Sequence, residues 1–144
     1  MTNRAPRVAI VPCSGIGKSF GTVSREAAYE VCDVLRPDET DLVALSKLVL
    51  GDEEACRRVE TQPVVTIDGC KLMCAATLVK LHGGAIASEV AVLDVYRRHR
   101  DLKPEGIAEL NEAGGQLAQV VAGEIGETVD RVRRGDSAEG ADRA

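Results

Sequence analysis

The chain has 144 residues, a formal net charge of −5 at pH 7 and a hydrophobic fraction of 44%. At this length it is expected to fold as one domain around its own core. The acidic charge provides no positive field for a phosphate backbone, and aromatic residues, at 2%, are too few for a base-stacking platform. No apolar run approaches the ~20 residues of a membrane span, and the segment before Pro12 is too poor in apolar residues for a signal peptide. We therefore expect a cytoplasmic protein that binds neither nucleic acid nor a membrane.

Strand-like and helix-like patterns alternate along the chain. The helix that follows the first β-branched run can be capped by Ser19 or Thr22. Apolar positions at helical spacing from Leu117 to Val132 outline a long C-terminal helix, which Gly123 and Gly126 interrupt. In chain order, the predicted strands cover 7–11, 41–45, 64–67 and 85–90, and the predicted helices cover 19–35, 52–59, 71–81, 93–100 and 117–132.

This alternation predicts an α/β fold. Strands separated by helices at this interval favour an open, mostly parallel sheet of about four strands with helices on both faces, a Rossmann-like three-layer single domain. We expect the domain to cover residues 7–134, after a flexible N-terminus at 1–6. Residues 135–144 have no large apolar side chain and are expected to form a disordered tail.

The segment after the first strand, Pro-Cys-Ser-Gly-Ile-Gly-Lys-Ser-Phe-Gly over residues 12–21, resembles a phosphate-binding loop. A Walker A loop needs glycine where Pro12 stands, and a dinucleotide-binding fingerprint needs its third glycine one residue before Gly21. A cysteine-phosphatase loop needs arginine where Ser19 stands. These three classes are therefore excluded. The glycines either serve only a tight turn or let the backbone close around a ligand of Cys13.

The cysteines carry the clearer signal. Cys13 follows the first predicted strand and Cys70 the third, so both are expected at the carboxyl edge of the sheet, where ligands usually bind. Cys70 and Cys74 are four residues apart and share one face if the segment is helical. In a reducing cytoplasm, clustered cysteines indicate metal or redox chemistry more often than structural disulfides. A CxxxC pattern alone remains a weak signal, because cysteine is also a common buried residue.

Four segments together carry a more specific resemblance. They are Pro-Cys-Ser-Gly-Ile-Gly-Lys at 12–18, Arg-Glu-Ala-Ala-Tyr at 25–29, Ile-Asp-Gly-Cys at 67–70 and Cys-Ala at 74–75. The combination resembles the DGC domain family of small bacterial and archaeal proteins, named for its central Asp-Gly-Cys motif, from about residue 7 to residue 135. The resemblance implies zinc binding, because the family's pattern contains several cysteines able to chelate a metal. It also implies that Cys13, Cys70 and Cys74 are the ligands.

Zinc prefers four tetrahedral ligands, so three thiolates leave one position to fill. Cys56 reaches the same edge if its helix is short, and is otherwise a core residue. Asp68 is either a ligand or a turn and capping residue, and water is the remaining candidate. Cys32 lies on the apolar face of the first predicted helix and is assigned to the core. His82 lies ~12 Å along a helix from Cys74, too far to share its metal ion.

Three functions are compatible with these residues. In the first, thiolates hold zinc, which is favoured over an iron–sulfur cluster, and the metal either joins the loops or is handed to a protein partner. In the second, Cys13 is the nucleophile of a thiol enzyme for redox or sulfur-group transfer. In the third, an open zinc position activates water, with Asp68 or Glu26 as general base.

Overall fold

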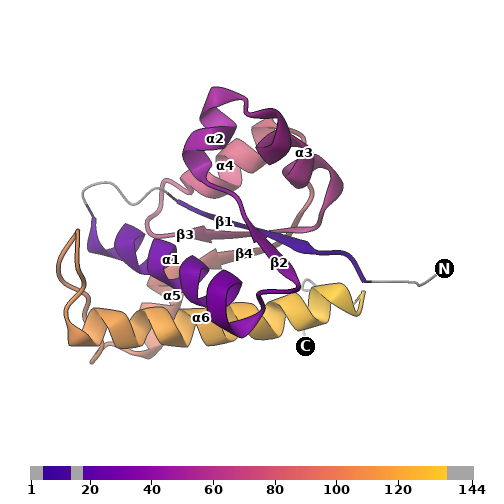
Figure 1. Ribbon diagram of the computed structural model, residues 1–144. Coiled ribbons are helices and arrows are strands. Elements are labelled where there is room, and N and C mark those ends of the chain that lie inside the picture. The colour runs from indigo at the N-terminus through magenta and orange to yellow at the C-terminus, as the bar shows by residue number, and fades with distance from the viewer. Residues whose placement is uncertain (1–4, 14–17, 136–144) are drawn as a thin grey trace.

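The computed structural model describes residues 5–13 and 18–135. Most of the predicted flexible N-terminus, nearly all of the predicted tail, and Gly15 and Gly17 of the opening loop lie outside the described residues. The elements in chain order are β1 (Val8–Pro12), α1 (Ser19–Glu30), the π-helical turn η1 (Val31–Leu35), β2 (Thr40–Leu42), α2 (Leu45–Leu50), α3 (Glu53–Thr61), β3 (Val64–Asp68), α4 (Cys74–Leu81), β4 (Ile86–Ala91), α5 (Val92–Arg98) and α6 (Glu112–Arg133), as Figure 1 shows.

The strands form one all-parallel sheet in the order β2-β1-β3-β4. In the register of the central pair, Pro12 of β1 stands opposite Ile67 of β3. Because both strands run in the same direction, the segments that leave them emerge side by side at the carboxyl edge of the sheet. This confirms the predicted α/β class, and no helix within the described residues is long and apolar enough to cross a membrane.

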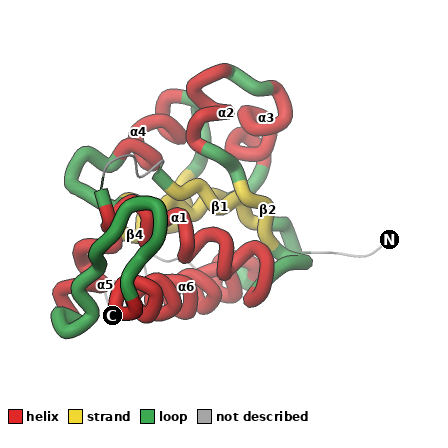
Figure 2. Tube along the Cα trace, turned by 60° about the vertical axis from the view of Figure 1, so that its left-hand side comes forward, coloured by secondary structure: helices red, strands yellow, loops and turns green. Residues whose placement is uncertain are grey.

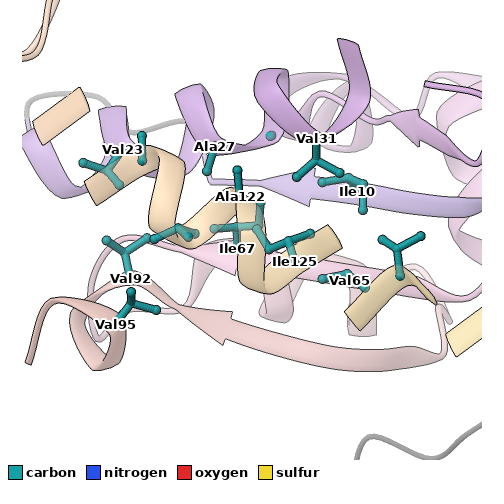
Figure 3. Packing of buried hydrophobic residues seen from close by; sticks show 14 of the residues in the cluster. Ile10, Val23, Ala27, Val31, Val65, Ile67, Val92, Val95, Ala122 and Ile125 are labelled. Carbon is teal, nitrogen blue, oxygen red and sulfur yellow. The ribbon is translucent and has the colours of Figure 1, made fainter. Parts of the chain in front are cut away.

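Helices cover both faces of the sheet. α1, α5 and α6 lie on one face and α2, α3 and α4 on the other, as the two views in Figures 1 and 2 show. The central strands are therefore buried on both faces, which explains their unbroken apolar runs. Figure 3 shows the larger core, where Ile10, Val65 and Ile67 of the sheet meet Val23 and Ala27 of α1, Val31 of η1, and Ala122 and Ile125 of α6.

The second predicted strand is shorter than the sequence pattern indicates. β2 ends at Leu42, and the chain turns into α2 at Leu45. Leu45 and Leu48 are buried, whereas Ser46 between them is exposed, a three-residue spacing that suits a helix rather than a strand. The prediction of a strand through residue 45 is therefore wrong, because the apolar run belongs to two elements.

The first helix also differs from expectation at its start. Lys18 occupies the N-cap position of α1, and its own side chain makes no capping hydrogen bond. The hydroxyl of Thr22 instead donates to the carbonyl of Ile107 at 2.7 Å, so it fastens the loop after α5 to α1. The predicted extension of the helix to Leu35 is present as η1, a single π-helical turn.

α6 runs without interruption through Gly123 and Gly126, the two glycines that interrupt its sequence pattern. At Gly126 the guanidinium of Arg36 packs against the helix, and a β-carbon there would lie 3.4 Å from its Cζ, an ordinary contact distance. Arg36 then donates to both carboxylate oxygens of Asp130, at 2.8 Å each. The apolar stripe of α6 and this contact outweigh the low helix propensity of glycine.

Candidate functional site

The central strand pair places Cys13 against the Asp-Gly-Cys segment. The backbone N–H of Cys13 donates to the carbonyl of Ile67 at 2.8 Å, which extends the β1–β3 ladder by one residue. The backbone N–H of Gly69 then donates to Sγ of Cys13 at 3.3 Å. Two cysteine loops far apart in the sequence are thereby joined directly, as the parallel topology predicts.

A second partner of the Cys13 sulfur comes from α1. Ser24 Oγ lies 3.0 Å from Cys13 Sγ, and the same hydroxyl lies 2.6 Å from the carbonyl of Gly21. A hydroxyl has one proton, which here goes to Gly21, so the neutral thiol donates to Ser24. If Cys13 becomes a thiolate, the Ser24 hydroxyl can rotate and donate to sulfur. No sequence pattern identified Ser24, because the contact depends on how α1 packs against β1.

The glycine of the Asp-Gly-Cys motif is required by close packing. A β-carbon on Gly69 would lie 2.6 Å from the backbone nitrogen of Gly21 and 2.7 Å from the backbone of Phe20. Only glycine lets the start of α1 approach this turn so closely. The approach brings Ser24 within reach of Cys13, since Ser24 lies one helical turn beyond Gly21.

Asp68 is the N-terminal anchor of α4. One carboxylate oxygen accepts from the N–H of Ala75 at 2.8 Å, and the other accepts from the N–H of Ala76 at 3.2 Å. The side chain is almost fully buried, and this burial raises the pKa of Asp68 while the two amide donors oppose the rise. Each oxygen accepts one amide hydrogen bond, so Asp68 serves as a capping residue for the start of α4.

The turn between the two later cysteines holds them near Cys13. Met73 adopts a left-handed conformation with φ of +53°, unusual for a residue with a side chain, and α4 begins directly after it at Cys74. Cys70 is half-buried and Cys74 is exposed. Partial desolvation, followed by the nearby Asp68, Cys70 and Cys13, raises the pKa of the Cys74 thiol. Cys13, Cys70 and Cys74, called the edge cysteines below, are therefore electrostatic neighbours.

The edge cysteines offer three sulfur donors, the chemistry that suits zinc, copper(I) and other soft metals. Their side chains do not converge on one point, however. Within residues 5–13 and 18–135, no group of three or more His, Cys, Asp or Glu side chains is placed to hold a metal ion. The sulfur chemistry of these residues suits a thiophilic metal, but as placed the side chains form no metal-binding group, so coordination would require them to rotate toward one another.

The other two cysteines lie away from this edge. Cys56 Sγ is 3.6 Å from Nδ1 of His82, which follows the last residue of α4. Since Cys74 is the first residue of that helix, Cys56 and Cys74 stand at opposite ends of it, ~12 Å apart along its axis. The structure thus does not bring Cys56 to the edge cysteines. Cys32 packs against the larger core beside α1, as predicted.

Glu26, the other predicted general base, faces away from the edge cysteines. It lies two residues after Ser24 on α1, which turns its side chain by ~200° around the helix. Together with Glu30 and Glu109 it lines a cavity of about 540 Å³ between α1, α6 and the segment before α6. Glu26 is therefore not placed to act on the edge cysteines, whereas Asp68 lies near Cys74 with each of its oxygens in an amide hydrogen bond.

Comparison with known proteins gives one match. The family model of the DGC domain matches residues 9–114, from β1 into the first turn of α6, and this span includes all the edge cysteines and more than half of the chain. Searches of curated proteins and of solved structures found no match. The matched span contains the Asp68-Gly69-Cys70 segment whose cap, close packing and sulfur are described above. The chain belongs to the DGC domain family.

Proposed function

We propose that the protein binds a soft metal ion, with zinc as the expected ion, through the thiolates of the edge cysteines. The observation that carries the proposal is the hydrogen bond from Gly69 N–H to Cys13 Sγ at 3.3 Å. It fixes the sulfur at the end of β1 next to the turn that bears the two other sulfurs. N–H donors to sulfur are typical partners of metal-bound thiolates, because they orient the ligand and reduce its charge.

Electrostatics support a cation at this place. Desolvation and the nearby Asp68, Cys70 and Cys13 all raise the pKa of Cys74, so this thiol resists ionising in the absence of a cation. A bound divalent cation reverses this effect, since metal coordination deprotonates a thiol outright. Metal binding would therefore supply the ionised form of Cys74, which the unliganded protein disfavours.

The fourth position favours metal handling over a closed structural site. Both oxygens of Asp68 accept amide hydrogen bonds, and Cys56 lies with His82 at the far end of α4. Three thiolates then leave one coordination position for water or for a ligand of another molecule. Because Cys74 is exposed, an incoming protein partner can reach the ion there and accept it by exchange of ligands.

Zinc titration of the reduced protein tests this function. We expect a single zinc ion to bind in competition with a chromophoric chelator, and Cys13→Ser, Cys70→Ser and Cys74→Ser each to lower the affinity by roughly 10- to 100-fold or more. Cys32→Ser is the matched control and should bind as the unmodified protein does. Folded, reduced protein that binds no zinc would contradict the proposal.

A thiol enzyme is the second candidate, and the contacts of Cys13 favour it. Ser24 and the N–H of Gly69 both lie within hydrogen-bonding distance of the sulfur and can both donate to a thiolate. This candidate requires Cys13 to react faster than an ordinary thiol without metal. Site-resolved alkylation of metal-free protein at neutral pH decides the point, and a Cys13 rate no higher than that of a free thiol rejects it.

A further inference from the structure

A thiol and an imidazole meet at the opposite edge of the α4 layer from the edge cysteines. Cys56 Sγ, in the first half of α3, lies 3.6 Å from Nδ1 of His82 at the end of α4. Both residues are half-buried, so small molecules can reach the pair while the core holds its backbone in place. Neither residue belongs to the metal site proposed above.

The turn after α4 is built to hold His82 against α3. The N–H of His82 donates to the carbonyls of Leu78 and Val79, and the N–H of Gly84 donates back to Val79 at 2.9 Å. A β-carbon on Gly84 would lie 3.0 Å from the carbonyl oxygen of Val59 on α3 and 2.5 Å from a methyl group of Val79. Only glycine permits this approach, and Val59 lies about one helical turn beyond Cys56.

We propose that Cys56 and His82 form a second thiol site, which exchanges with low-molecular-weight disulfides. A free thiol is only a few per cent ionised at pH 7, and the thiolate is the nucleophile in disulfide exchange. An imidazole at hydrogen-bonding distance can accept the thiol proton near neutral pH. The pair therefore combines a nucleophile with a base. Without the imidazole, Cys56 would be an unreactive residue packed against the core.

The reaction balances with the disulfide as the single co-reactant. The Cys56 proton moves to Nδ1 of His82, and the thiolate attacks one sulfur of the disulfide. A new S–S bond forms to Cys56 as the original S–S bond breaks, and the leaving thiolate takes the proton from His82. Cys56 is oxidised from thiol to mixed disulfide, while the departing sulfur is reduced to a thiol.

The experiment follows mixed-disulfide formation residue by residue. Reduced, full-length protein is treated at pH 7 with bis(2-hydroxyethyl) disulfide, an uncharged probe, and quenched samples are analysed by peptide mass spectrometry. We expect Cys56 to react roughly tenfold faster in the unmodified protein than in His82→Gln, because glutamine cannot accept the proton. Cys32 serves as an internal reference, since burial raises the pKa of its thiol and slows its reaction.

Two controls keep the result interpretable. His99→Gln makes the same chemical change at the only other histidine of the chain and should leave the Cys56 rate unchanged. An unchanged Cys32 rate in His82→Gln shows that the fold is intact. If Cys56 reacts equally fast in the unmodified protein and in His82→Gln, or no faster than Cys32 in the unmodified protein, the proposal is overturned. Because the rate is read at Cys56 alone, this outcome leaves the metal site of the edge cysteines unaffected.

Discussion

The backbone N–H of Gly69 donates a hydrogen bond to the sulfur of Cys13 at 3.3 Å. Gly69 belongs to the Asp-Gly-Cys motif, and each residue of that motif has a different structural role. Asp68 caps α4, Gly69 admits the backbone of α1 and holds the Cys13 sulfur, and Cys70 supplies a further thiol. The motif therefore connects β1, α1 and α4 and contributes one thiol beside Cys13.

Gly69→Ala should destabilise the protein by about 1–3 kcal/mol, the usual cost of forcing extra atoms into a packed region. The added β-carbon would meet backbone atoms of Phe20 and Gly21 at 2.6–2.7 Å, and backbone cannot rotate away as a side chain can. Urea denaturation of the metal-free protein measures the change. Displacement of α1 should also weaken zinc binding, since it separates Ser24 from Cys13.

Gly115→Ala is the matched control for this substitution. Gly115 lies in α6, where a β-carbon would meet nothing within 4 Å. Alanine there should stabilise the protein by roughly 0.5–1 kcal/mol, because it favours the helix over the unfolded chain. Equal effects of the two substitutions would show that close packing at Gly69 is not the cause.

Ser24→Ala should lower zinc affinity about tenfold with unchanged stoichiometry, the usual consequence of removing a hydrogen bond to a metal ligand. The hydroxyl lies 3.0 Å from Cys13 Sγ and is a donor that a thiolate can use. Competition with a chelator measures the affinity. Ser46→Ala, at an exposed position of α2, is the control and should have no effect. Equal affinities of the two variants would remove Ser24 from the site.

The pH dependence of stability tests the buried state of Asp68. Burial raises the pKa of Asp68 in the folded protein, so the native state holds this proton to higher pH than the unfolded state does. Its contribution to stability is complete below the unfolded pKa and is lost as the pH rises through the raised folded pKa. The free energy of unfolding of the unmodified protein, minus that of Asp68→Asn, should therefore fall from acid toward neutral pH in metal-free samples.

Asp41 provides the opposite sign in the same experiment. Hydrogen bonds from Arg7, at 2.9–3.2 Å, lower the pKa of Asp41 against the effect of its burial. Its contribution is present above the unfolded pKa and is lost as the pH falls through the lowered folded pKa. The corresponding difference for Asp41→Asn should rise from acid toward neutral pH. Slopes of the same sign for both variants would contradict these assignments.

The architecture could be predicted from the sequence because strands that are buried on both faces appear as nearly continuous apolar runs. Val8 to Val11 and Val64 to Ile67 are nearly unbroken apolar runs followed by cysteine segments, and this combination predicted a parallel sheet with Cys13 and Cys70 at one edge. The helical spacing of the buried residues also predicted α1 and α6, although Gly123 and Gly126 interrupted the pattern of α6.

Other features depend on packing that a single sequence does not encode locally. The left-handed Met73 starts α4 three residues later than the periodicity predicts, and a positive φ at methionine has no sequence signature. Ser24 lies in an ordinary helical stretch and gains its role only where α1 crosses Gly69. The sequence predicted Cys56 as a possible metal ligand, whereas in the structure α3 places it beside His82.

The central claim is that Cys13, Cys70 and Cys74 bind one metal ion together. Cobalt(II) in place of zinc tests it most directly, because its near-ultraviolet sulfur-to-metal absorption increases with the number of bound thiolates. Cys13→Ser, Cys70→Ser and Cys74→Ser should each lose a similar share of this absorption, while Cys32→Ser and Cys56→Ser keep all of it. Full intensity in Cys13→Ser, or a loss in Cys56→Ser, would contradict the account.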